Sequence, residues 1–380
     1  GTGHAMQQAM PGTPDKNRVL VLFGDVPLLM PKTLSALLDE TPPDEVSVLT
    51  VDMDDPTGYG RIIREAGGDG VSAIVEEKDA SAKEKAVREI NTGVLACPAD
   101  KLKRWLDNLS NDNAQGEYYL TDVIAMAVDD RVEVHGIKAS SPVEVMGIND
   151  KKQLAEAERA LQSRLVDALM KEGVGFADPA RVDIRGTLTC GKDVFIDVNA
   201  VFEGDVELGD GVKIESNNLI RDSRIGAGTV VHSNCHIEAS STGQGCEIGP
   251  FSRLRPGAEL ANNVKVGNFV EIKKSTVDEG SKVNHLTYIG DTEIGTGVNV
   301  GAGTITCNYD GANKHKTTIG DGAFIGSGVE LVAPVEIGKN ATIGAGSTIT
   351  KAAPDDQLTL ERAKQTSISG WKRPVKKGAK

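Results

Sequence analysis

The chain has 380 residues and a formal net charge of −13, so we expect two domains and no binding to the phosphate backbone of nucleic acids. No apolar run approaches the roughly 20 residues of a membrane span, and the start resembles no signal peptide, which predicts a cytoplasmic protein without a membrane partner. The five cysteines show no metal-ligand spacing and are expected to be free thiols.

The first part of the chain alternates apolar runs with helix-like segments. The runs VLVLFGD, EVSVLTVDM, VSAIVEE, EINTGVLAC and VEVHGIK predict strands, and Pro31–Asp39 and Ala99–Leu109 predict helices. This alternation is typical of an α/β domain, for which we expect a largely parallel sheet covered by helices. Ligands of such sheets bind at the carboxyl ends of strands, where the motifs GDVP and INTG fall.

A helix is predicted to connect this domain with the rest of the chain. Asn149 or Asp150 can cap its start, and Gly173 stands at its end. Its apolar stripe consists of Leu154, Ala157, Leu161, Leu165 and Leu169. A coiled-coil dimer is the alternative, but the stripe is too short to favour it.

Beyond about Val182 the sequence repeats with a period of six, as in IGAGT, IGDGA and IGSGV. This period is the signature of a hexapeptide parallel β-helix, in which three repeats form one triangular coil. The unmatched stretch Cys307–Lys316 is predicted to project as a loop. The aliphatic or aromatic positions expected inside the coils are Ile196, Phe202, Leu208, Ile214, Ile220, Ile225, Val231, Ile237, Ile248, Leu254, Leu260, Val266, Ile272, Val277, Val283, Ile289, Ile294, Val300, Ile319, Ile325, Leu331, Ile337, Ile343 and Ile349.

Polar side chains occur within the repeats where the predicted core does not need them. Arg255 has a planar fork that fits a phosphate and Lys273 offers a point charge, although each could be an ordinary surface cation. His285 is suited to take a proton from an attacking amine near neutral pH, and Tyr288 follows it; a structural His is the alternative. Together they suggest an anionic substrate with an amine, but the spacing does not show that they converge.

Long motifs along the chain resemble one bacterial enzyme family. LRPGAEL, VGNFVEIKK, NHLTYIGD, VGAGTITCNYDGANKHKT and GWKRPVKK are similar to the C-terminal half of the bifunctional N-acetylglucosamine-1-phosphate uridyltransferase/glucosamine-1-phosphate acetyltransferases. GTGHAMQQAM, GDVPLL, DDPTGYGRI, EINTG, NAQGEYYLTD and DPARVDIRGTL resemble the N-terminal half and its junction. The resemblance implies a nucleotidyltransferase-like (Rossmann-like) α/β domain at residues 1–149, a linker helix at 150–173, and a left-handed parallel β-helix with a C-terminal tail at 174–380.

For the β-helix the resemblance implies a homotrimer that transfers acetyl from acetyl-CoA to the amine of glucosamine 1-phosphate, in a cleft between subunits. His285 matches the catalytic base, and Glu271 lies beside this set, where it could orient the amine or His285. Positions matching sugar-phosphate contacts are Arg255, Lys273, Tyr288 and Asn299. Positions matching acetyl-CoA contacts are Ala302, Asn308, Tyr309, Ser327, Ala345 and Arg362.

For the N-terminal domain the resemblance implies transfer of UMP from UTP to N-acetylglucosamine 1-phosphate, with Mg²⁺ at Asp25 and Asn149. Phe23 stands where the family often has Tyr, so a hydroxyl is lost. The family opens with a Gly-rich phosphate-binding loop, and we expect a fragment that lacks about the first 80 residues and has little uridyltransferase activity. Positions matching UDP-sugar contacts are Gly1, Thr2, Phe23, Gly24, Asp25, Gly60, Glu76, Asn91 and Asn149.

Two other functions stay open: a hexapeptide acyltransferase for a different sugar or amine, and a trimeric scaffold without catalysis. The basic end WKRPVKKGAK is either a solvated tail or a contact for the phosphates of CoA. We expect no metal at His232 and His236, because metal binding by residues four apart belongs to helices. We treat His4, His135 and His315 as ordinary polar residues.

Overall fold

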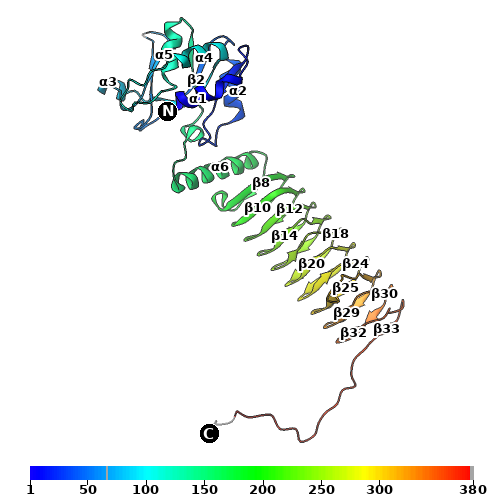
Figure 1. Cartoon of the computed structure of the whole chain (residues 1–380). Coiled ribbons are helices and arrows are strands. Elements are labelled where there is room, and N and C mark those ends of the chain that lie inside the picture. Colours follow the sequence, from blue (N-terminus) through cyan, green and yellow to red (C-terminus); the bar gives the residue numbers. More distant parts are fainter. Residues whose placement is uncertain (66, 377–380) are drawn as a thin grey trace. The chain divides into compact units, whose positions relative to one another are not determined.

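A computed structural model of the chain describes residues 1–65 and 67–376 (Figure 1). The chain divides into an N-terminal unit, Gly1–Leu161, and a solenoid unit, Gln162–Lys380. Residues 377–380, the end of the predicted basic tail, lie outside the described residues. None of the described helices combines the length and apolar character that crossing a membrane requires.

A six-stranded sheet forms the centre of the N-terminal unit, in the order β4-β3-β5-β2-β6 with β1 also paired to β5. The predicted α/β domain is confirmed, but the expected largely parallel sheet is wrong. Among the described pairings only β2–β6 is parallel, whereas β5 is antiparallel to β1, β2 and β3. Apolar runs predict where strands lie, but not whether neighbouring strands run parallel or antiparallel. Strand β5 is long enough to pair with three strands. The strands are β1 (Arg18–Val21), β2 (Val46–Asp52), β3 (Arg61–Arg64), β4 (Val71–Val75), β5 (Glu89–Pro98) and β6 (Val134–Lys138).

Both faces of this sheet are buried. Alternate residues of a strand point to opposite faces: on β5, Leu95 and Cys97 join a core with α4 and α5, whereas Val94 and Ala96 join a core with α2. The two predicted helices are therefore present as α2 and α4. The helical elements of this unit are α1 (Thr2–Ala9), η1 (Met10–Gly12), α2 (Pro31–Asp39), α3 (Ala82–Lys85), α4 (Ala99–Asp107), α5 (Asp122–Asp129) and η2 (Pro142–Val145).

Helix α6 (Lys151–Lys171) begins after Asp150, whose Oδ1 accepts the N–H of Gln153 at 2.8 Å and caps the helix. Ala157 and Leu169 of the predicted stripe are buried. Leu154 is 45% exposed, so the predicted stripe is wrong at its start. The periodicity gives the spacing of a stripe but not where along the helix a covering surface begins.

The second half of α6 closes the end of the solenoid. Val166 and Leu169 belong to the core of the first coils. Gln162 is buried and exchanges two hydrogen bonds with the backbone of Ile184, which lie at 2.9 and 2.7 Å. A solenoid must cover the open core of its terminal coils, and here a helix does so.

The solenoid is a triangular prism of parallel strands (Figure 1), in which most residues in register lie 17 or 18 apart, and 25 apart where the loop after β26 lengthens the coil. Face one is an 11-stranded sheet: β7 (Gly175–Phe176), β9 (Phe195–Ile196), β11 (Lys213–Ile214), β13 (Val230–Val231), β16 (Glu247–Ile248), β19 (Lys265–Asn268), β22 (Lys282–His285), β25 (Asn299–Val300), β28 (Phe324–Ile325), β31 (Thr342–Ile343) and β33 (Leu358–Thr359).

Faces two and three share the long strands of the first coils, which follow the short helix η3 (Pro179–Arg181): β8 (Val182–Cys190), β10 (Ala200–Leu208) and β12 (Leu219–Ile225). Face two continues through β14 (His236–Glu238), β17 (Arg253–Leu254), β20 (Glu271–Lys273), β23 (Tyr288–Gly290), β26 (Ile305–Cys307), β29 (Glu330–Val332) and β32 (Thr348–Ile349). Face three continues through β15 (Ser241–Thr242), β18 (Ala258–Leu260), β21 (Ser275–Val277), β24 (Thr292–Ile294), β27 (Thr317–Ile319) and β30 (Val335–Ile337).

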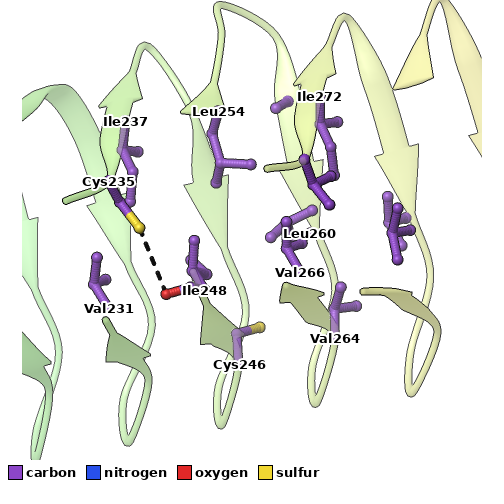
Figure 2. Close-up of a cluster of buried hydrophobic side chains, with 14 of the residues drawn as sticks. Val231, Cys235, Ile237, Cys246, Ile248, Leu254, Leu260, Val264, Val266 and Ile272 are labelled. Atoms are coloured by element: carbon purple, nitrogen blue, oxygen red, sulfur yellow. Dashed lines mark hydrogen bonds between the residues drawn. The ribbon is translucent and has the colours of Figure 1, made fainter. Parts of the chain in front are cut away.

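Every core position predicted from the six-residue period is buried. Figure 2 shows how residues of successive coils stack, for example Ile237, Leu254 and Ile272. Some repeats have Thr where the period would place an aliphatic residue. The hydroxyl oxygen of Thr242 accepts the N–H of Gly226 at 3.0 Å, and that of Thr306 accepts the N–H of Gly290 at 2.8 Å. The five cysteines are free, as expected.

At the first corner, where face one passes into face two, each coil turns through a residue with positive φ. Glycine and Asn adopt this conformation most readily, which explains their frequency in the repeat. The predicted loop is present between β26 and β27. The first-corner residues, in chain order, are Asn199, Asn217, Asn234, Phe251, Phe269, Leu286, Gly303, Gly328 and Gly346.

Candidate active sites

His285 lies at the end of β22, next to the first corner, and its side chain is exposed. Asn268 has the equivalent place one coil earlier, because the strand register pairs it with His285. The Nδ1 of His285 lies 2.9 Å from the Oδ1 of Asn268. When Nδ1 donates a hydrogen to this oxygen, the Nε2 lone pair is free to accept a proton.

Face two carries three of the four residues predicted to contact a sugar phosphate. Glu271 is in register with Tyr288, Lys273 lies two residues further along β20, and Arg255 directly follows β17. The Nη1 of Arg255 lies 2.7 Å from an oxygen of Glu271, and this hydrogen bond raises the pKa of Arg255. The result is a fixed cationic fork beside a Lys, an arrangement that fits a phosphate.

Asn299, the fourth predicted residue, lies on face one. It is in register with Lys282, on the strand that also carries His285. The two faces turn away from each other at the first corner. Asn299 and Arg255 therefore lie on different faces of the prism.

The predicted acetyl-CoA residues Ala302, Ser327 and Ala345 continue the column that Asn268 and His285 begin. The backbone N–H groups of Gly303, Gly328 and Gly346 donate to the carbonyl oxygens of His285, Ala302 and Ser327 in the preceding coils at 3.2, 2.8 and 2.9 Å. The residue after each position of this column has positive φ. In the coil of His285 it is the large Leu286, and in the following coils it is glycine. Beyond the coil of His285 the corner residues themselves therefore carry no large side chain, and at the last coil the C-terminal segment reaches the corner, where Arg362 contacts Ala345.

The remaining acetyl-CoA positions are in the loop after β26 and in the C-terminal segment. Asn308 is buried, and its Nδ2 donates to Asp291 at 2.5 Å. Tyr309 is exposed, with its hydroxyl 2.6 Å from the carbonyl of Gly311. Arg362 donates to the carbonyl of Ala345 at 3.0 Å, so the structure brings these two predicted residues together.

Further contacts hold this loop in shape. The Nζ of Lys314 lies 4.4 Å from the centre of the Tyr309 ring. His315, expected to be an ordinary polar residue, lies 2.6 Å from a carboxylate oxygen of Asp310. The backbone N–H of Asn313, the His315 ring and the N–H of Ala312 all lower the pKa of Asp310. Asp310 therefore stays ionised and anchors the loop.

In the N-terminal unit, a cavity of about 400 Å³ is lined by strand β5, by the segments that follow β1, β4 and η2, and by the segments that precede β3 and α5. Gly1 and Gly24 of the predicted UDP-sugar set are not in its lining; the first glycine packs instead against Glu117 and Tyr118. The other seven positions line it: Thr2, Phe23, Asp25, Gly60, Glu76, Asn91 and Asn149.

Several lining residues were not predicted. Thr121 donates to Glu76 at 3.0 Å. Gly93 has φ 82°, and a Cβ there would lie 2.1 Å from the ring of Phe23, so only glycine fits. The INTG motif already contained Gly93, but its close contact with a residue far away in sequence could not be read from the motif.

The two predicted magnesium ligands lie on loops that meet. The N–H of Ile148 donates to the carbonyl of Asp25 at 2.9 Å, which brings Asn149 near Asp25, and both side chains line the cavity. A carboxylate and an amide oxygen are hard donors that fit Mg²⁺.

One other group of potential ligands, Glu45, Glu133 and His135, lies where β2 and β6 begin. The Nε2 of His135 lies 2.5 Å from Glu45, as in an ordinary ion pair. This group of three residues lies at the starts of β2 and β6, away from the loops that carry Asp25 and Asn149.

Comparisons with known proteins bear on the fold and the family of the chain. Residues 316–351 match the family described as bacterial transferase hexapeptide (six repeats), which supports the left-handed β-helix type. The bifunctional protein GlmU of Azoarcus sp. (strain BH72) is 57% identical over 376 residues, covering 99% of this chain and 83% of the relative. That of Alkalilimnicola ehrlichii is 56% identical over 374 residues, covering 98% and 80%. A solved acyltransferase structure, Arabidopsis UDP-N-acetylglucosamine acyltransferase, is 16% identical with a TM-score of 0.40, covering 47% of this chain and 69% of its own.

Proposed function

The chain belongs to the family of bifunctional GlmU enzymes, and on this premise we propose that its solenoid unit acetylates glucosamine 1-phosphate with acetyl-CoA. The observation that carries the proposal is the first corner: His285, whose Nδ1 contacts Asn268, lies beside a face that bears Arg255 and Lys273. A base, a phosphate site and a corner without large side chains for the acyl donor thus lie along one edge of the prism.

The residues suit acyl transfer to an amine. The neutral amine of glucosamine 1-phosphate attacks the thioester carbonyl, and Nε2 of His285 accepts the proton that the nitrogen loses. The C–N bond forms, the C–S bond breaks, and the CoA thiolate takes the proton from the imidazolium as it leaves. Arg255, Lys273 and Tyr288 would bind the sugar phosphate and hold the amine in position.

We propose a homotrimer whose subunits share this site. The placement of Asn299 and Arg255 on different faces of the prism supports a shared site, since residues of neighbouring subunits would then surround the sugar together. An exposed apolar edge also supports association: Phe251, Phe269 and Leu286 are 51, 55 and 62% exposed, next to His285. Clustered exposed aromatic side chains are typical of subunit interfaces.

For the N-terminal unit we propose the uridylyl transfer of the family. A phosphate oxygen of N-acetylglucosamine 1-phosphate attacks the α-phosphorus of UTP, the bond to the β-phosphate breaks, and diphosphate leaves. Asp25 and Asn149 would hold Mg²⁺, which when bound neutralises phosphate charge. Glu76 and Asn91, on the cavity wall, would contact the sugar nucleotide. Weak activity of these 380 residues alone stays a prediction.

Separate assays test the two reactions: release of CoA thiol from acetyl-CoA with glucosamine 1-phosphate, and UTP-dependent turnover of N-acetylglucosamine 1-phosphate. His285→Ala is expected to lower kcat for thiol release by about 10²-fold or more, because a positioned base contributes about 10²–10⁴-fold. His4→Ala, which changes another exposed His, is the matched control. Near-normal turnover of a folded His285→Ala variant would refute the assignment.

The same assays separate the alternatives. A preference for an amine without phosphate would indicate a hexapeptide acyltransferase with another acceptor. A folded oligomer that releases no thiol with any acceptor would indicate a scaffold.

A further inference from the structure

We propose that Asn268 is a positioning residue that selects the tautomer and the orientation of His285, an inference that rests on the proposed acetyl transfer. The starting observation is the contact of 2.9 Å between the Oδ1 of Asn268 and the Nδ1 of His285. Neither the family motifs nor the six-residue period gave Asn268 a role.

The backbone enforces this contact without any ligand. Asn268 and His285 are register partners on adjacent strands of face one, and the N–H of Leu286 donates to the carbonyl of Asn268 at 3.1 Å. Each is followed by a first-corner residue with positive φ, Phe269 at 56° and Leu286 at 50°. Two equivalent backbone positions one coil apart therefore hold the two side chains side by side.

The chemistry of the pair favours a base at Nε2. A neutral imidazole carries one hydrogen, and the nitrogen that lacks it is the one that can accept a proton. The amide oxygen of Asn268 places the hydrogen on Nδ1, which leaves Nε2 for the amine. His285 is exposed, so little surrounding packing fixes its ring, and this hydrogen bond is what orients it.

Asparagine also fits the substrates better than a carboxylate would. Both glucosamine 1-phosphate and acetyl-CoA are anionic, so an acceptor without charge orients the ring and adds no repulsion. Glu271, on face two, is already paired with Arg255 at 2.7 Å. The orienting role thus falls to Asn268 and not to Glu271.

Substitution of Asn268 in the full chain tests the inference. Asn268→Ala is expected to lower kcat at least about 10-fold with little change in either KM, because a wrong tautomer impairs the chemical step and not binding. Asn268→Asp restores the oxygen acceptor and is expected to recover most of kcat, but with higher KM values, because its charge repels both anionic substrates. Ser216→Ala is the matched control: it removes a 3.2 Å contact with Ser233, also one coil apart, and should leave kcat unchanged.

Nitrogen NMR of ¹⁵N-histidine-labelled protein gives a readout that a merely structural role would not change. The signals of His285, assigned by their loss in His285→Ala, are expected to show a protonated Nδ1 in the wild type and a mixture of tautomers in Asn268→Ala. An unchanged spectrum or an unchanged kcat in Asn268→Ala would overturn the inference, even where His285→Ala is inactive and the proposed function stands. Activity of a folded His285→Ala variant would instead refute the proposed function itself.

Discussion

Arg255 is the proposed phosphate ligand with the clearest structural support, because Glu271 fixes its guanidinium while 33% of the side chain stays exposed. A hydrogen bond to a charged group contributes about 1.5–3 kcal/mol, which corresponds to about a 10- to 100-fold change in affinity. Arg255→Ala is therefore expected to raise KM for glucosamine 1-phosphate by that factor and to leave KM for acetyl-CoA nearly unchanged. Steady-state kinetics with each substrate varied in turn measures both constants.

Two further variants sharpen this experiment. Arg224→Ala removes another exposed Arg of the solenoid, paired with Glu207, and should change neither KM. Arg255→Lys keeps the charge but loses the planar fork, so an intermediate KM is expected. Equal increases in both KM values for Arg255→Ala would show that the Arg maintains the fold and does not bind the phosphate.

At the scale of one element, a bulky side chain at the first corner is expected to weaken the binding of acetyl-CoA. Gly328 follows Ser327 at this corner, and an added Cβ there meets no atom within 4 Å. Gly328→Leu is expected to raise KM for acetyl-CoA at least about 10-fold while the chain stays folded, since a left-handed residue costs only about 1–2 kcal/mol. Titration of acetyl-CoA at saturating sugar phosphate measures the effect.

Gly297→Leu is the matched control for this prediction. Gly297 has the same φ of 66° and equally open surroundings, but it belongs to another corner of the coil. An increase in KM for acetyl-CoA in this variant as well would mean that backbone strain, and not a blocked corner, is the cause.

Strand β5 carries a buried carboxylate that makes stability depend on pH. Glu89 accepts hydrogen bonds from Arg64 at 2.8 and 2.6 Å and from Thr50 at 2.7 Å. Burial acts to raise the pKa of Glu89, but these hydrogen bonds outweigh it and the pKa is lowered. A lowered folded-state pKa means that Glu89 stabilises the fold above its unfolded pKa, and this stability is lost as pH falls through the folded-state pKa.

Glu89→Gln is accordingly expected to lower the free energy of unfolding of the N-terminal unit by about 1–3 kcal/mol at pH 7, with a smaller loss toward low pH. Urea unfolding at several pH values, followed by fluorescence of the buried Trp105 in the same unit, measures this. Glu40→Gln changes an exposed Glu and should have little effect. A Glu89→Gln loss that is the same at pH 3 and pH 7 would contradict the role of the ionised carboxylate.

The elements also show which features the sequence could predict. The six-residue period predicted only positions that are buried, but it missed a second set of buried aliphatic side chains, such as Val212, Val264 and Val298. It missed Thr242 and Thr306, where a hydroxyl bonds to a glycine N–H of the preceding coil. Strand direction in the N-terminal sheet and the pairing of Asn268 with His285 depend on contacts between segments, which no local pattern contains.

At the scale of the whole molecule, the proposed trimer depends on the apolar first-corner edge. The rings of Phe251 and Phe269 are stacked, with 5.4 Å between their centres and an angle of 14° between their planes. They form a flat, exposed apolar surface beside the proposed base. Burying this edge between subunits would bring face one of one chain against face two of the next, which is the arrangement that the proposed shared site implies for Asn299 and Arg255. A substitution that separates the subunits should therefore also abolish the acetyltransferase activity.

Phe269→Asp tests this link, because Asp tolerates the left-handed conformation of that position while its charge opposes burial. We expect light scattering to show a shift from trimer to monomer, with loss of most thiol release and with the far-ultraviolet circular dichroism of the β-helix retained. Asn263→Asp adds the same charge at another positive-φ corner position and is expected to stay trimeric and active. A monomeric Phe269→Asp variant with full acetyltransferase activity would show that one chain suffices for the site, and the shared cleft would then have to be abandoned.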